Sequence, residues 1–403
     1  MQQYKNPAKS QGEKKDSWVI CISGGLDIRL SYRPGNSIRK ELKMNGKKGY
    51  LLSAVIAALI IFCGCEKVEK VSTNAKSAVF PADKNVKIAV ILDTDICDDI
   101  DDTWALALLL QSPEFDIKLI TTAVGDTTAR TKVVAKILQT AGRTDIPIGT
   151  GVAIGDMKTG HRQDGWVKDF DLSKYPGKIY QDGVQAMIDT IMNSPEPITL
   201  IAIGPLPNVA AALEREPNIA KKARFVGMQG SIRRGYGENS KPQKEYNVVS
   251  FIKASRTVFT AQWDMTITPL DTCAMVSLDG EDYKKVLDCN SPIAKAVIEN
   301  YRVWAKSGNI NEAQAGARSS TLFDTVGVYL AMSHNLLEME NLGIRVTDDG
   351  RTVIDGKAKK INCAMKWKDL SAFESFLVER LTSQAIPAPT SDAARQPADA
   401  NGK

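Results

Sequence analysis

Short apolar runs alternate with longer segments of helical periodicity along most of the chain. Residues 87–92 (KIAVIL) are typical of a buried strand, and residues 101–112 (DDTWALALLLQS) follow with the length and spacing of a helix. A second strand is predicted at 115–126, and a second helix at 128–142 ends at a glycine. The alternation continues with a helix at 182–194, a strand at 198–205, a helix at 206–216, and strands at 223–231 and 264–271. This order predicts a single α/β domain with a mostly parallel open sheet flanked by helices and a Rossmann-like core.

The two ends of the chain differ in composition from this alternating pattern. Residues 1–43 are polar and basic, and we interpret them as a leader that is disordered or that precedes the true start at Met44. The folded domain is expected at 86–383. The Pro/Ala/Asp-rich segment 384–403 predicts a disordered tail.

Residues 44–65 have the form of an export signal, with a basic start and an apolar run at 51–62. That run is shorter than the ~20 residues that span a bilayer, which favours a signal peptide over an uncleaved membrane anchor. Its end, Phe62-Cys-Gly-Cys65, resembles a bacterial lipoprotein cleavage box and predicts lipidation of Cys65. We therefore expect an exported protein, lipid-anchored to a bacterial membrane through a polar tether at 66–85, on the periplasmic face or the cell surface.

Charge and composition exclude several classes of protein. The 403 residues carry 52 Lys and Arg against 47 Asp and Glu, a net charge of +5 without a basic stripe, so nucleic acid is not an expected partner. The two histidines, His161 and His334, are too few for a histidine-rich zinc site. The seven cysteines show no CxxC spacing, and they indicate no disulfide framework.

The segment 93–102, DTDICDDIDD, is the main candidate for chemistry. Like charges at the end of a buried strand repel one another and burial disfavours each ionised form, so we expect a bound cation. Carboxylate oxygens suit Ca²⁺ or Mg²⁺ rather than zinc or copper. The segment is not an EF-hand, because the turn glycine and the closing glutamate are absent. The attraction of a helix N-terminus for acidic residues explains Asp101 and Asp102 but not Asp93 and Asp95.

An apolar strand followed by Asp-x-Asp also resembles the opening motif of haloacid-dehalogenase-type phosphohydrolases. Those enzymes have threonine or valine two positions further on, where this chain has Cys97. The motif also leaves Asp101 and Asp102 without a role. A Mg²⁺-dependent phosphohydrolase is therefore the weaker alternative.

The acidic segment resembles the signature of the calcium-dependent, inosine–uridine-preferring nucleoside hydrolases. That signature is a strand followed by Asp-Thr-Asp, a short loop and Asp-Asp, and here the loop is two residues longer. Further segments resemble other motifs of the family, in the family's order, over about residues 87–380. These are 203–210 (IGPLPNVA) for Gly-Pro-Leu-Thr-Asn, 228–231 (MQGS) for Met-Gly-Gly, 239–247 (NSKPQKEYN) for Asn…Glu-Phe-Asn, and 322–325 (LFDT) for His-Asp.

The resemblance implies a calcium site and a reaction. Asp95 would take a proton from a calcium-bound water, because a cation lowers the pKa of the water that it binds. Carboxylates near the sugar would stabilise the oxocarbenium-like state of N-glycoside cleavage. The implied ligands of Ca²⁺ are Asp95, Asp102, the Ile203 carbonyl and Asp324. The implied contacts to ribose are Asp101, Asn239, Glu245 and Asn247.

Three of these residues have simpler interpretations. Asp324 opens an apolar helical segment and would serve as a helix cap. Asn247 would be a turn residue, and Glu245 a solvated one.

The chain departs from the family's pattern near the expected base. Phe323 stands where many members have the histidine proposed to protonate the departing base, and a phenyl ring can stack but cannot donate a proton. Asp126 occupies the place of an asparagine that contacts the sugar, and a carboxylate only accepts hydrogen bonds. His161 lies in a segment expected near the pocket. The candidates for stacking on the base are Trp166, Tyr236 and Trp304, and the simpler role for each is core packing.

We therefore predict hydrolysis of the N-glycosidic bond of ribonucleosides, or of related N-ribosides, to ribose and free base. The alternative is a homologue that binds ribosides or sugar conjugates with little turnover, which Phe323 favours. The expected partners are a small nucleoside or riboside and a membrane, reached through the lipid anchor. The resemblance also implies a homo-oligomer.

Overall fold

The computed structural model describes residues 87–158, 161–237, 240–308 and 312–384, together with three strands near the N-terminus. Cys65 and the predicted signal peptide, tether and tail lie outside the described residues, apart from Met44 and Gln384 at their edges. The chain divides into two compact units, Met1–Ala75 and Lys76–Lys403. In the first unit, within the segment interpreted as a leader, an antiparallel sheet is formed by β1 (Asp16–Ile22), β2 (Leu26–Tyr32) and β3 (Arg39–Met44).

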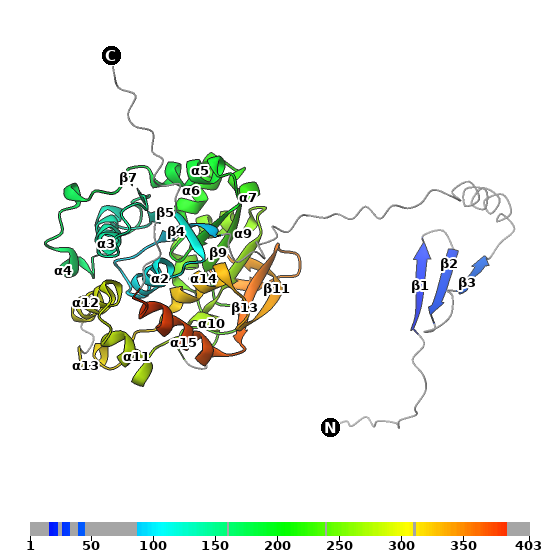
Figure 1. Ribbon diagram of the computed structural model, residues 1–403. Helices are drawn as coiled ribbons and strands as arrows, with labels where there is room; N and C mark the ends of the chain where they lie inside the picture. The colour runs from blue at the N-terminus through cyan, green and yellow to red at the C-terminus, as the bar shows by residue number, and fades with distance from the viewer. Residues whose placement is uncertain are drawn as a thin grey trace, which may run out of the picture. The chain divides into compact units, whose positions relative to one another are not determined.

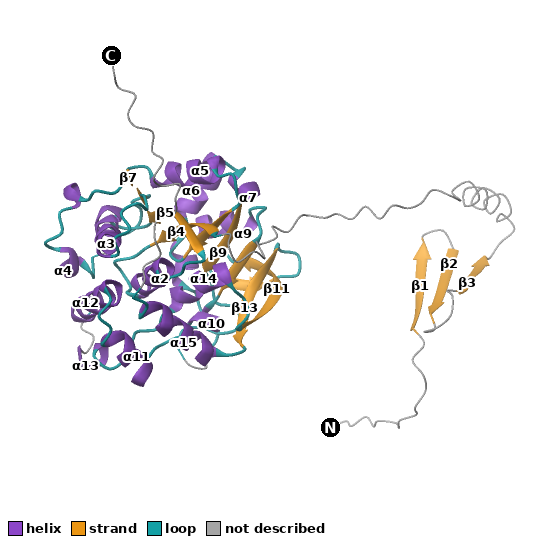
Figure 2. Ribbon diagram, viewed as in Figure 1, coloured by secondary structure: helices purple, strands orange, loops and turns teal. Residues whose placement is uncertain are grey.

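The second unit is built on a ten-stranded sheet of order β12-β11-β13-β10-β9-β8-β4-β5-β6-β7 (Figure 2). All neighbouring strands from β13 to β7 are parallel, while β11 is antiparallel to both β13 and β12. The predicted mostly parallel α/β sheet is therefore confirmed. The strands are β4 (Ile88–Thr94), β5 (Phe115–Thr122), β6 (Ile148–Thr150), β7 (Ile179–Tyr180), β8 (Ile198–Ala202), β9 (Ala223–Met228), β10 (Met265–Thr268), β11 (Leu337–Val346), β12 (Thr352–Ile354) and β13 (Lys360–Trp367).

Helices cover both faces of this sheet, because successive side chains of a strand point to opposite faces (Figure 1). In β4, Val90 and Leu92 pack in one core with α2, α3, α12, α14 and α15, whereas Ala89 and Ile91 pack in another with α5, α6, α7 and α9. The helices are α2 (Asp101–Leu110), α3 (Thr127–Thr140), α4 (Asp164–Val167), α5 (Gly183–Asn193), α6 (Pro207–Arg215), α7 (Ile219–Lys222), α8 (Tyr246–Ser250), α9 (Ile252–Thr260), α10 (Leu270–Cys273), α11 (Gly280–Leu287), α12 (Pro292–Ser307), α13 (Glu312–Ala315), α14 (Phe323–Met332) and α15 (Leu370–Leu381), with a 3₁₀ turn at Leu172–Lys174.

Helix α2 is buried along its whole length. Its sequence, DDTWALALLL, is apolar on all sides after the first three residues, and such a helix is stable only inside a core. It packs against α14, α12 and α15. As a consequence, its first two residues, Asp101 and Asp102, are carried into the interior of the protein.

The carboxyl ends of the parallel strands meet at one edge of the sheet, which is where ligands bind in folds of this kind. The chain bends sharply after β4 and β5. Cys97 and Val124 have φ angles of +88° and +69°, and no other non-glycine residue of the described part adopts this left-handed conformation. Both residues lie in the loops that directly follow β4 and β5.

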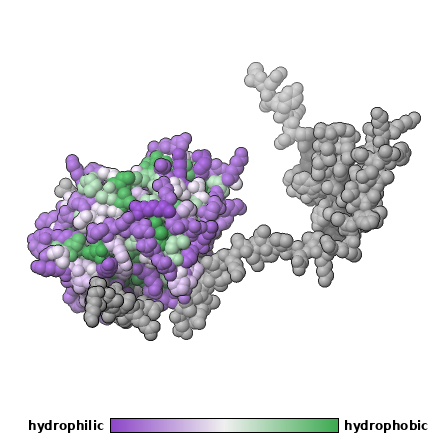
Figure 3. Space-filling model, turned by 90° about the horizontal axis from the view of Figure 1, so that it is seen from above, coloured by the Kyte–Doolittle hydropathy of each residue, from purple (hydrophilic) through white to green (hydrophobic). Residues whose placement is uncertain are grey.

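The surface of this unit is mainly hydrophilic on the face that Figure 3 shows, with hydrophobic residues in small separate patches. Among the described residues, no helix has both the length and the apolar character that crossing a bilayer requires.

Candidate active site

A cavity of about 200 Å³ opens at the carboxyl edge of the sheet. This volume is below the ~300–1,000 Å³ of pockets for drug-sized ligands, which favours a small substrate. Of the residues predicted for the site, the cavity is lined by Asp95, Asp101, Asp102, Ile203, Glu245, Asn247, Phe323 and Asp324. Trp166 and Asp126 are not among its lining residues, and Asn239 lies outside the described part of the chain.

The cavity has two halves that differ in how they are supported. The buried half is formed by side chains at the ends of core strands and helices: Asp95, Asp101, Asp102, Ile203, Met228, Glu245, Asn247 and Asp324, all of them buried. The open half is formed by more exposed side chains: Asp98, Asp99, Arg162, Tyr236, Tyr246 and Phe323.

Three carboxylates of the buried half lie close enough to share an ion. Asp101 and Asp102 begin α2, and Asp324 is the second residue of α14, which packs against α2. One carboxylate oxygen from each of the three lies within 4.8 Å of the other two. Since Ca²⁺–oxygen distances are ~2.3–2.6 Å, oxygens at this spacing can contact the same cation.

No cationic side chain among the described residues that line the buried half balances these three carboxylates, although the charge of Arg130, which is not part of the lining, lowers the pKa of Asp102. Burial raises the pKa of Asp101, Asp102 and Asp324 well above the ordinary range, and the repulsion among neighbouring carboxylates raises it further. A divalent cation reverses this penalty, because it supplies the missing positive charge.

Asp95 lines the same cavity but does not belong to this close group of three. Its carboxylate lies against Gly204, where a Cβ atom would be 2.4 Å from Asp95 Oδ1, so only glycine leaves room for it. Burial raises the pKa of Asp95 to about 6, and the charge of Arg130 opposes this rise. Asp101 was expected to contact ribose, and Asp102 and Asp324 were expected to bind the ion. The structure places all three in one group.

The donor set fits a hard cation. It consists of buried carboxylates and the Ile203 carbonyl, which also accepts a hydrogen bond from Asn247 Nδ2 at 3.0 Å. Oxygen donors of this kind suit Ca²⁺ or Mg²⁺. No histidine or cysteine is among the described residues that line the cavity.

Neutral side chains hold the acidic residues in place. The Thr94 hydroxyl donates a hydrogen bond to Asp102 Oδ1 and accepts one from the Ile96 amide at 3.1 Å. Asp93 is not among the lining residues and accepts hydrogen bonds from Thr121 Oγ1 at 2.5 Å and Asn208 Nδ2 at 2.8 Å. Burial raises the pKa of Asp93 to about 7.

Arg130 is a buried cation that the sequence analysis did not single out. It lies on α3, and its Nε and Nη1 atoms donate to the carbonyl oxygens of Val124 and Ile96, each at 2.7 Å. These bonds connect Arg130 to the loops after β4 and β5, which contain the left-handed residues Cys97 and Val124. The charge of the guanidinium also opposes the rise in the pKa of Asp95. Nothing in its sequence neighbourhood distinguishes Arg130 from a solvated helical arginine, so only the structure identifies it.

Glu245 and Asn247 are fixed at the start of α8. Glu245 is 2% exposed, so its interpretation as a solvated residue is wrong. Its carboxylate accepts hydrogen bonds from the amides of Asn247 at 2.7 Å and Gly230 at 2.8 Å, and burial raises its pKa to about 7. Asn247 Nδ2 donates to the carbonyl oxygens of Ile203 and Met228, each at 3.0 Å. Both side chains are therefore rigid parts of the cavity wall.

The open half has an aromatic side. Phe323 and Tyr236 meet edge to face, with ring centroids 5.9 Å apart and an angle of 78° between the rings. The Tyr236 hydroxyl accepts a hydrogen bond from the Tyr246 amide at 2.9 Å. Together with Tyr246, these rings offer faces on which a heteroaromatic base can stack.

Trp166 lies elsewhere, which corrects the expectation that it contacts the base. Its ring is 7% exposed and packs beneath the Lys136 ammonium, 4.1 Å from the ring centroid. Its Nε1 atom lies 3.5 Å from Glu299 Oε2. Trp166 therefore serves core packing. Trp304 is buried as well and donates from Nε1 to the Asp98 carbonyl at 2.9 Å, so it supports the cavity from behind.

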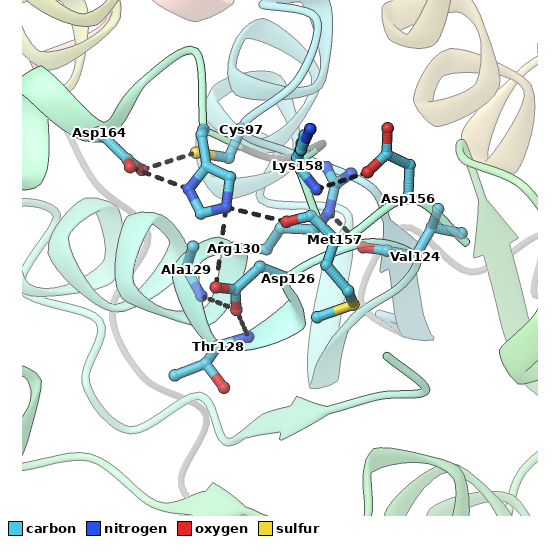
Figure 4. A network of polar contacts seen from close by, with 11 residues as sticks. Cys97, Val124, Asp126, Thr128, Ala129, Arg130, Asp156, Met157, Lys158 and Asp164 are labelled. Atoms are coloured by element: carbon cyan, nitrogen blue, oxygen red, sulfur yellow. Dashed lines mark hydrogen bonds and ion pairs between the residues drawn. The ribbon is translucent and has the colours of Figure 1, made fainter. Parts of the chain in front are cut away.

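Asp126 caps α3 and is also placed away from the cavity lining. Its Oδ1 atom accepts hydrogen bonds from the amides of Thr128 and Ala129, each at 3.0 Å (Figure 4). Its Oδ2 atom lies 3.8 Å from His161 Nε2. His161 in turn pairs through Nδ1 with Asp164 Oδ2 at 2.9 Å. Both residues thus belong to a network that joins the loop before α4 to the start of α3.

Comparison with known proteins identifies the relatives of this chain. The model of the family described as inosine-uridine preferring nucleoside hydrolase matches residues 90–375. A non-specific ribonucleoside hydrolase RihC from Klebsiella pneumoniae subsp. pneumoniae is 29% identical over 237 residues, 56% of this chain and 76% of that protein. The protein of the same name from Salmonella paratyphi B is 32% identical over 225 residues, 53% of this chain and 71% of that protein.

Solved structures agree with these matches. A plant nucleoside hydrolase, the PpNRh1 enzyme, superimposes with a TM-score of 0.64 at 25% identity, over 74% of this chain and all (100%) of that one. A purine-preferring ribonucleoside hydrolase from Gardnerella vaginalis shares the fold, with a TM-score of 0.62 at 21% identity over 73% of this chain and 98% of that one. The chain belongs to the inosine-uridine preferring nucleoside hydrolase family.

Proposed function

We propose that this protein cleaves ribonucleosides with Ca²⁺ as its cofactor and Asp95 as the base that accepts a proton from the attacking water. As a member of the family it is an N-glycosyl hydrolase, which releases ribose and a free base. The single observation that carries the cofactor proposal is the group of three buried carboxylates with oxygens within 4.8 Å of one another. No cation among the described lining residues of the buried half offsets their charge.

The buried half would hold the ion and the sugar. Asp102, Asp324 and the Ile203 carbonyl would bind Ca²⁺ together with Asp95. When bound, a divalent cation lowers the pKa of water and orients the ribose hydroxyls. Asp101 would accept a hydrogen bond from a ribose hydroxyl, and Asn239, Glu245 and Asn247 would hold the rest of the sugar.

Asp95 suits the role of base. With a pKa of about 6 it is largely ionised at neutral pH, so it can accept a proton. Its carboxylate lies close to Gly204, in space that a side chain at position 204 would occupy. As the C1′–N bond weakens, positive charge develops on the sugar, and the carboxylates around the ribose stabilise that charge.

A riboside-binding protein with little turnover is the second candidate function. The observation that favours it is Phe323, which lines the cavity and has no proton to donate to a departing base.

One experiment separates the two. Purified protein is incubated with a panel of purine and pyrimidine ribonucleosides, with Ca²⁺ or with a chelator, and released ribose is measured. The hydrolase predicts ribose that appears with Ca²⁺ and is at least about 100-fold slower with chelator. Calcium binding without ribose release from any substrate would favour the binding protein. Ribose release at equal rates with and without chelator would contradict the cofactor proposal.

We also propose that the enzyme is exported and lipid-anchored through Cys65 to a bacterial membrane. The support is the basic start, the short apolar run and the cleavage-box resemblance of residues 44–65. Incorporation of a labelled fatty acid into the wild-type chain but not into Cys65→Ser tests the proposal, and equal labelling of both would contradict it.

A further inference from the structure

The aromatic side of the cavity offers no evident group to protonate a departing base. Phe323 lacks a polar atom, and it occupies the space beside Tyr236. The Tyr236 hydroxyl already accepts a hydrogen bond from the Tyr246 amide. Partial burial raises the pKa of Tyr236 above its ordinary value, which makes it a poorer proton donor. Departure of the base therefore requires another group that stabilises the negative charge developing on it.

Arg162 is the single cationic side chain among the described residues that line the cavity. We propose that Arg162 is a catalytic residue that stabilises the departing base by donating hydrogen bonds to its ring nitrogen or carbonyl oxygen atoms. This inference rests on the proposed riboside hydrolysis. A guanidinium keeps its charge at any physiological pH, so this stabilisation requires no titrating acid.

The guanidinium of Arg162 is held in place from several sides. Its carbon atom lies 4.1 Å from the centroid of the Trp304 ring, and Trp304 is fixed by its hydrogen bond to the Asp98 carbonyl. The Arg162 amide donates to the Cys97 carbonyl at 3.1 Å. Both attachments lead to the loop between β4 and α2. A donor that is already positioned stabilises developing charge without further rearrangement.

Gly308 makes room for this position. A Cβ atom at residue 308 would lie 2.0 Å from Arg162 Nη2, so the guanidinium occupies the space above this glycine. Gly308 is the C-cap of α12 with φ −94°, a conformation that any residue adopts. The end of α12 therefore does not require a glycine at this position, whereas the close approach of Arg162 does.

The hydrogen-bonding capacity of the guanidinium is unused by the protein. An arginine side chain has five N–H donors. Within the described part of the chain, the Arg162 guanidinium stacks on Trp304 and its charge lowers the pKa of Asp99, but its N–H groups donate no hydrogen bond to a protein acceptor. The Arg162 guanidinium lines the cavity, so its N–H groups are available to a ligand bound there.

The surrounding charges favour a neutral base over a phosphate group as that ligand. Asp98 and Asp99 line the open half together with Arg162, and the buried carboxylates lie beyond them. A phosphate would be repelled by this acidic wall. Neutral ring nitrogen and carbonyl acceptors avoid the repulsion, and Phe323 and Tyr236 supply apolar faces for the ring.

The chemistry balances without any further reactant. One water adds to the nucleoside: its oxygen bonds to C1′ and one of its protons goes to Asp95. The C1′–N bond breaks and its electron pair leaves with the base. Arg162 stabilises the negative charge that develops on the base, which then takes a proton from solvent while Asp95 returns its proton to solvent. Arg162 lowers the barrier to C–N cleavage and transfers no proton itself.

A comparison of leaving groups tests this role. The kcat values of wild-type protein and Arg162→Gln are measured with Ca²⁺ for inosine, uridine and p-nitrophenyl β-D-riboside, whose phenolate departs without assistance. The variant is expected to lose about 100-fold in kcat on both nucleosides. It should lose about threefold or less on the nitrophenyl riboside, and that turnover also shows that the variant folds and retains its metal and ribose sites. The kcat of Arg162→Lys on the nucleosides should lie between the values of wild type and Arg162→Gln, because lysine keeps the charge but not the planar set of donors.

A second variant moves the guanidinium without removing it. In Gly308→Ala the new methyl group displaces the flexible end of Arg162, so kcat on the nucleosides should fall while the nitrophenyl riboside is unaffected. Arg302→Gln is the matched control, since Arg302 is exposed on the same helix, α12, that carries Trp304. It should leave all three substrates unchanged.

Two results would overturn the proposal. Equal loss on all three substrates would show that Arg162 only supports the fold of the site, and an unchanged nucleoside kcat in Arg162→Gln would show that it does not act on the base. Failure of the wild-type protein to release ribose from any of the three is a different outcome, which refutes the proposed function itself and this inference with it.

Discussion

At the scale of single residues, the acidic groups in and next to the cavity depend on uncharged neighbours. The Thr94 hydroxyl orients Asp102, the amide of Asn208 holds Asp93, and the missing side chain of Gly204 leaves space for Asp95. Partners of this kind fix the direction in which a ligand atom points, so they matter to metal affinity nearly as much as the ligands do.

Replacement of Thr94 tests this dependence. Thr94→Val keeps the shape of the side chain but removes its hydrogen bond to Asp102, so Ca²⁺ affinity should fall by about 10- to 100-fold. Thr94→Ser, which keeps the hydroxyl, should bind nearly as wild type. Calorimetric titration with Ca²⁺ measures both. Wild-type affinity in Thr94→Val would mean that Asp102 does not need this partner or does not bind the ion.

The sequence predicted the members of the site better than their arrangement. Asp102 was identified from the acidic cluster that follows an apolar strand, and Asp324 and Glu245 from the resemblance of their segments to motifs of the family. Trp166 was misplaced because aromatic character alone does not tell a cavity wall from a core. Arg162 and Arg130 were missed because their roles come from contacts with residues far along the chain, at Trp304 and Ile96.

At the scale of elements, alternating apolar and helical segments were sufficient to predict the parallel part of the sheet. The predicted strand 115–126 ends at Thr122, because Val124 turns into the left-handed region. The antiparallel edge formed by β11 and β12 was not predicted. The burial of β11 alternates only in part, with four of its ten residues buried, so its sequence lacks the continuous apolar run of the central strands.

The cap of α3 gives an element-scale prediction. Asp126→Ala removes the side chain that accepts hydrogen bonds from the first turn, so the free energy of unfolding should fall by about 0.5–2 kcal/mol. Asp126→Asn keeps a capping oxygen and should be nearly as stable as wild type. Denaturant unfolding gives the stabilities. Since Asp126 does not line the cavity, both variants should also keep the wild-type KM for nucleosides. A several-fold change in KM for Asp126→Asn would restore the expectation that this residue contacts the sugar.

At the scale of the whole molecule, the buried carboxylates in and next to the cavity link stability to pH and, through the proposed ion, to calcium. Asp93, Asp95 and Glu245 have pKa values raised by burial to about 7, 6 and 7 in the folded chain. A carboxyl group whose pKa is higher in the folded than in the unfolded state stabilises the fold fully below its unfolded pKa. That contribution is lost as the pH rises through the folded value.

The metal-free protein should therefore lose thermal stability between pH 5 and pH 8. The proposed Ca²⁺ would bind the ionised carboxylates, so the stabilisation that it adds should grow over the same range. At a Ca²⁺ concentration of about 100 times Kd it should reach about 2.7 kcal/mol. Thermal unfolding in chelator and in excess CaCl₂ at several pH values measures both effects. A metal-free Tm that rises from pH 5 to pH 8 would contradict the buried carboxylates as the source of the linkage.

The two halves of the cavity are supported by different parts of the protein, and this affects how the specificity of the enzyme can be changed. The buried half is fixed by helix α2 and the strand ends, so alterations there would disturb the core of the protein. Apart from Arg162, which acts on the departing base, the open half is formed by less buried side chains such as Tyr236, Tyr246 and Phe323. A mutant library confined to those three positions would vary the choice of nucleobase while it leaves the scaffold intact. New specificities would then be selected without a parallel search for compensating mutations.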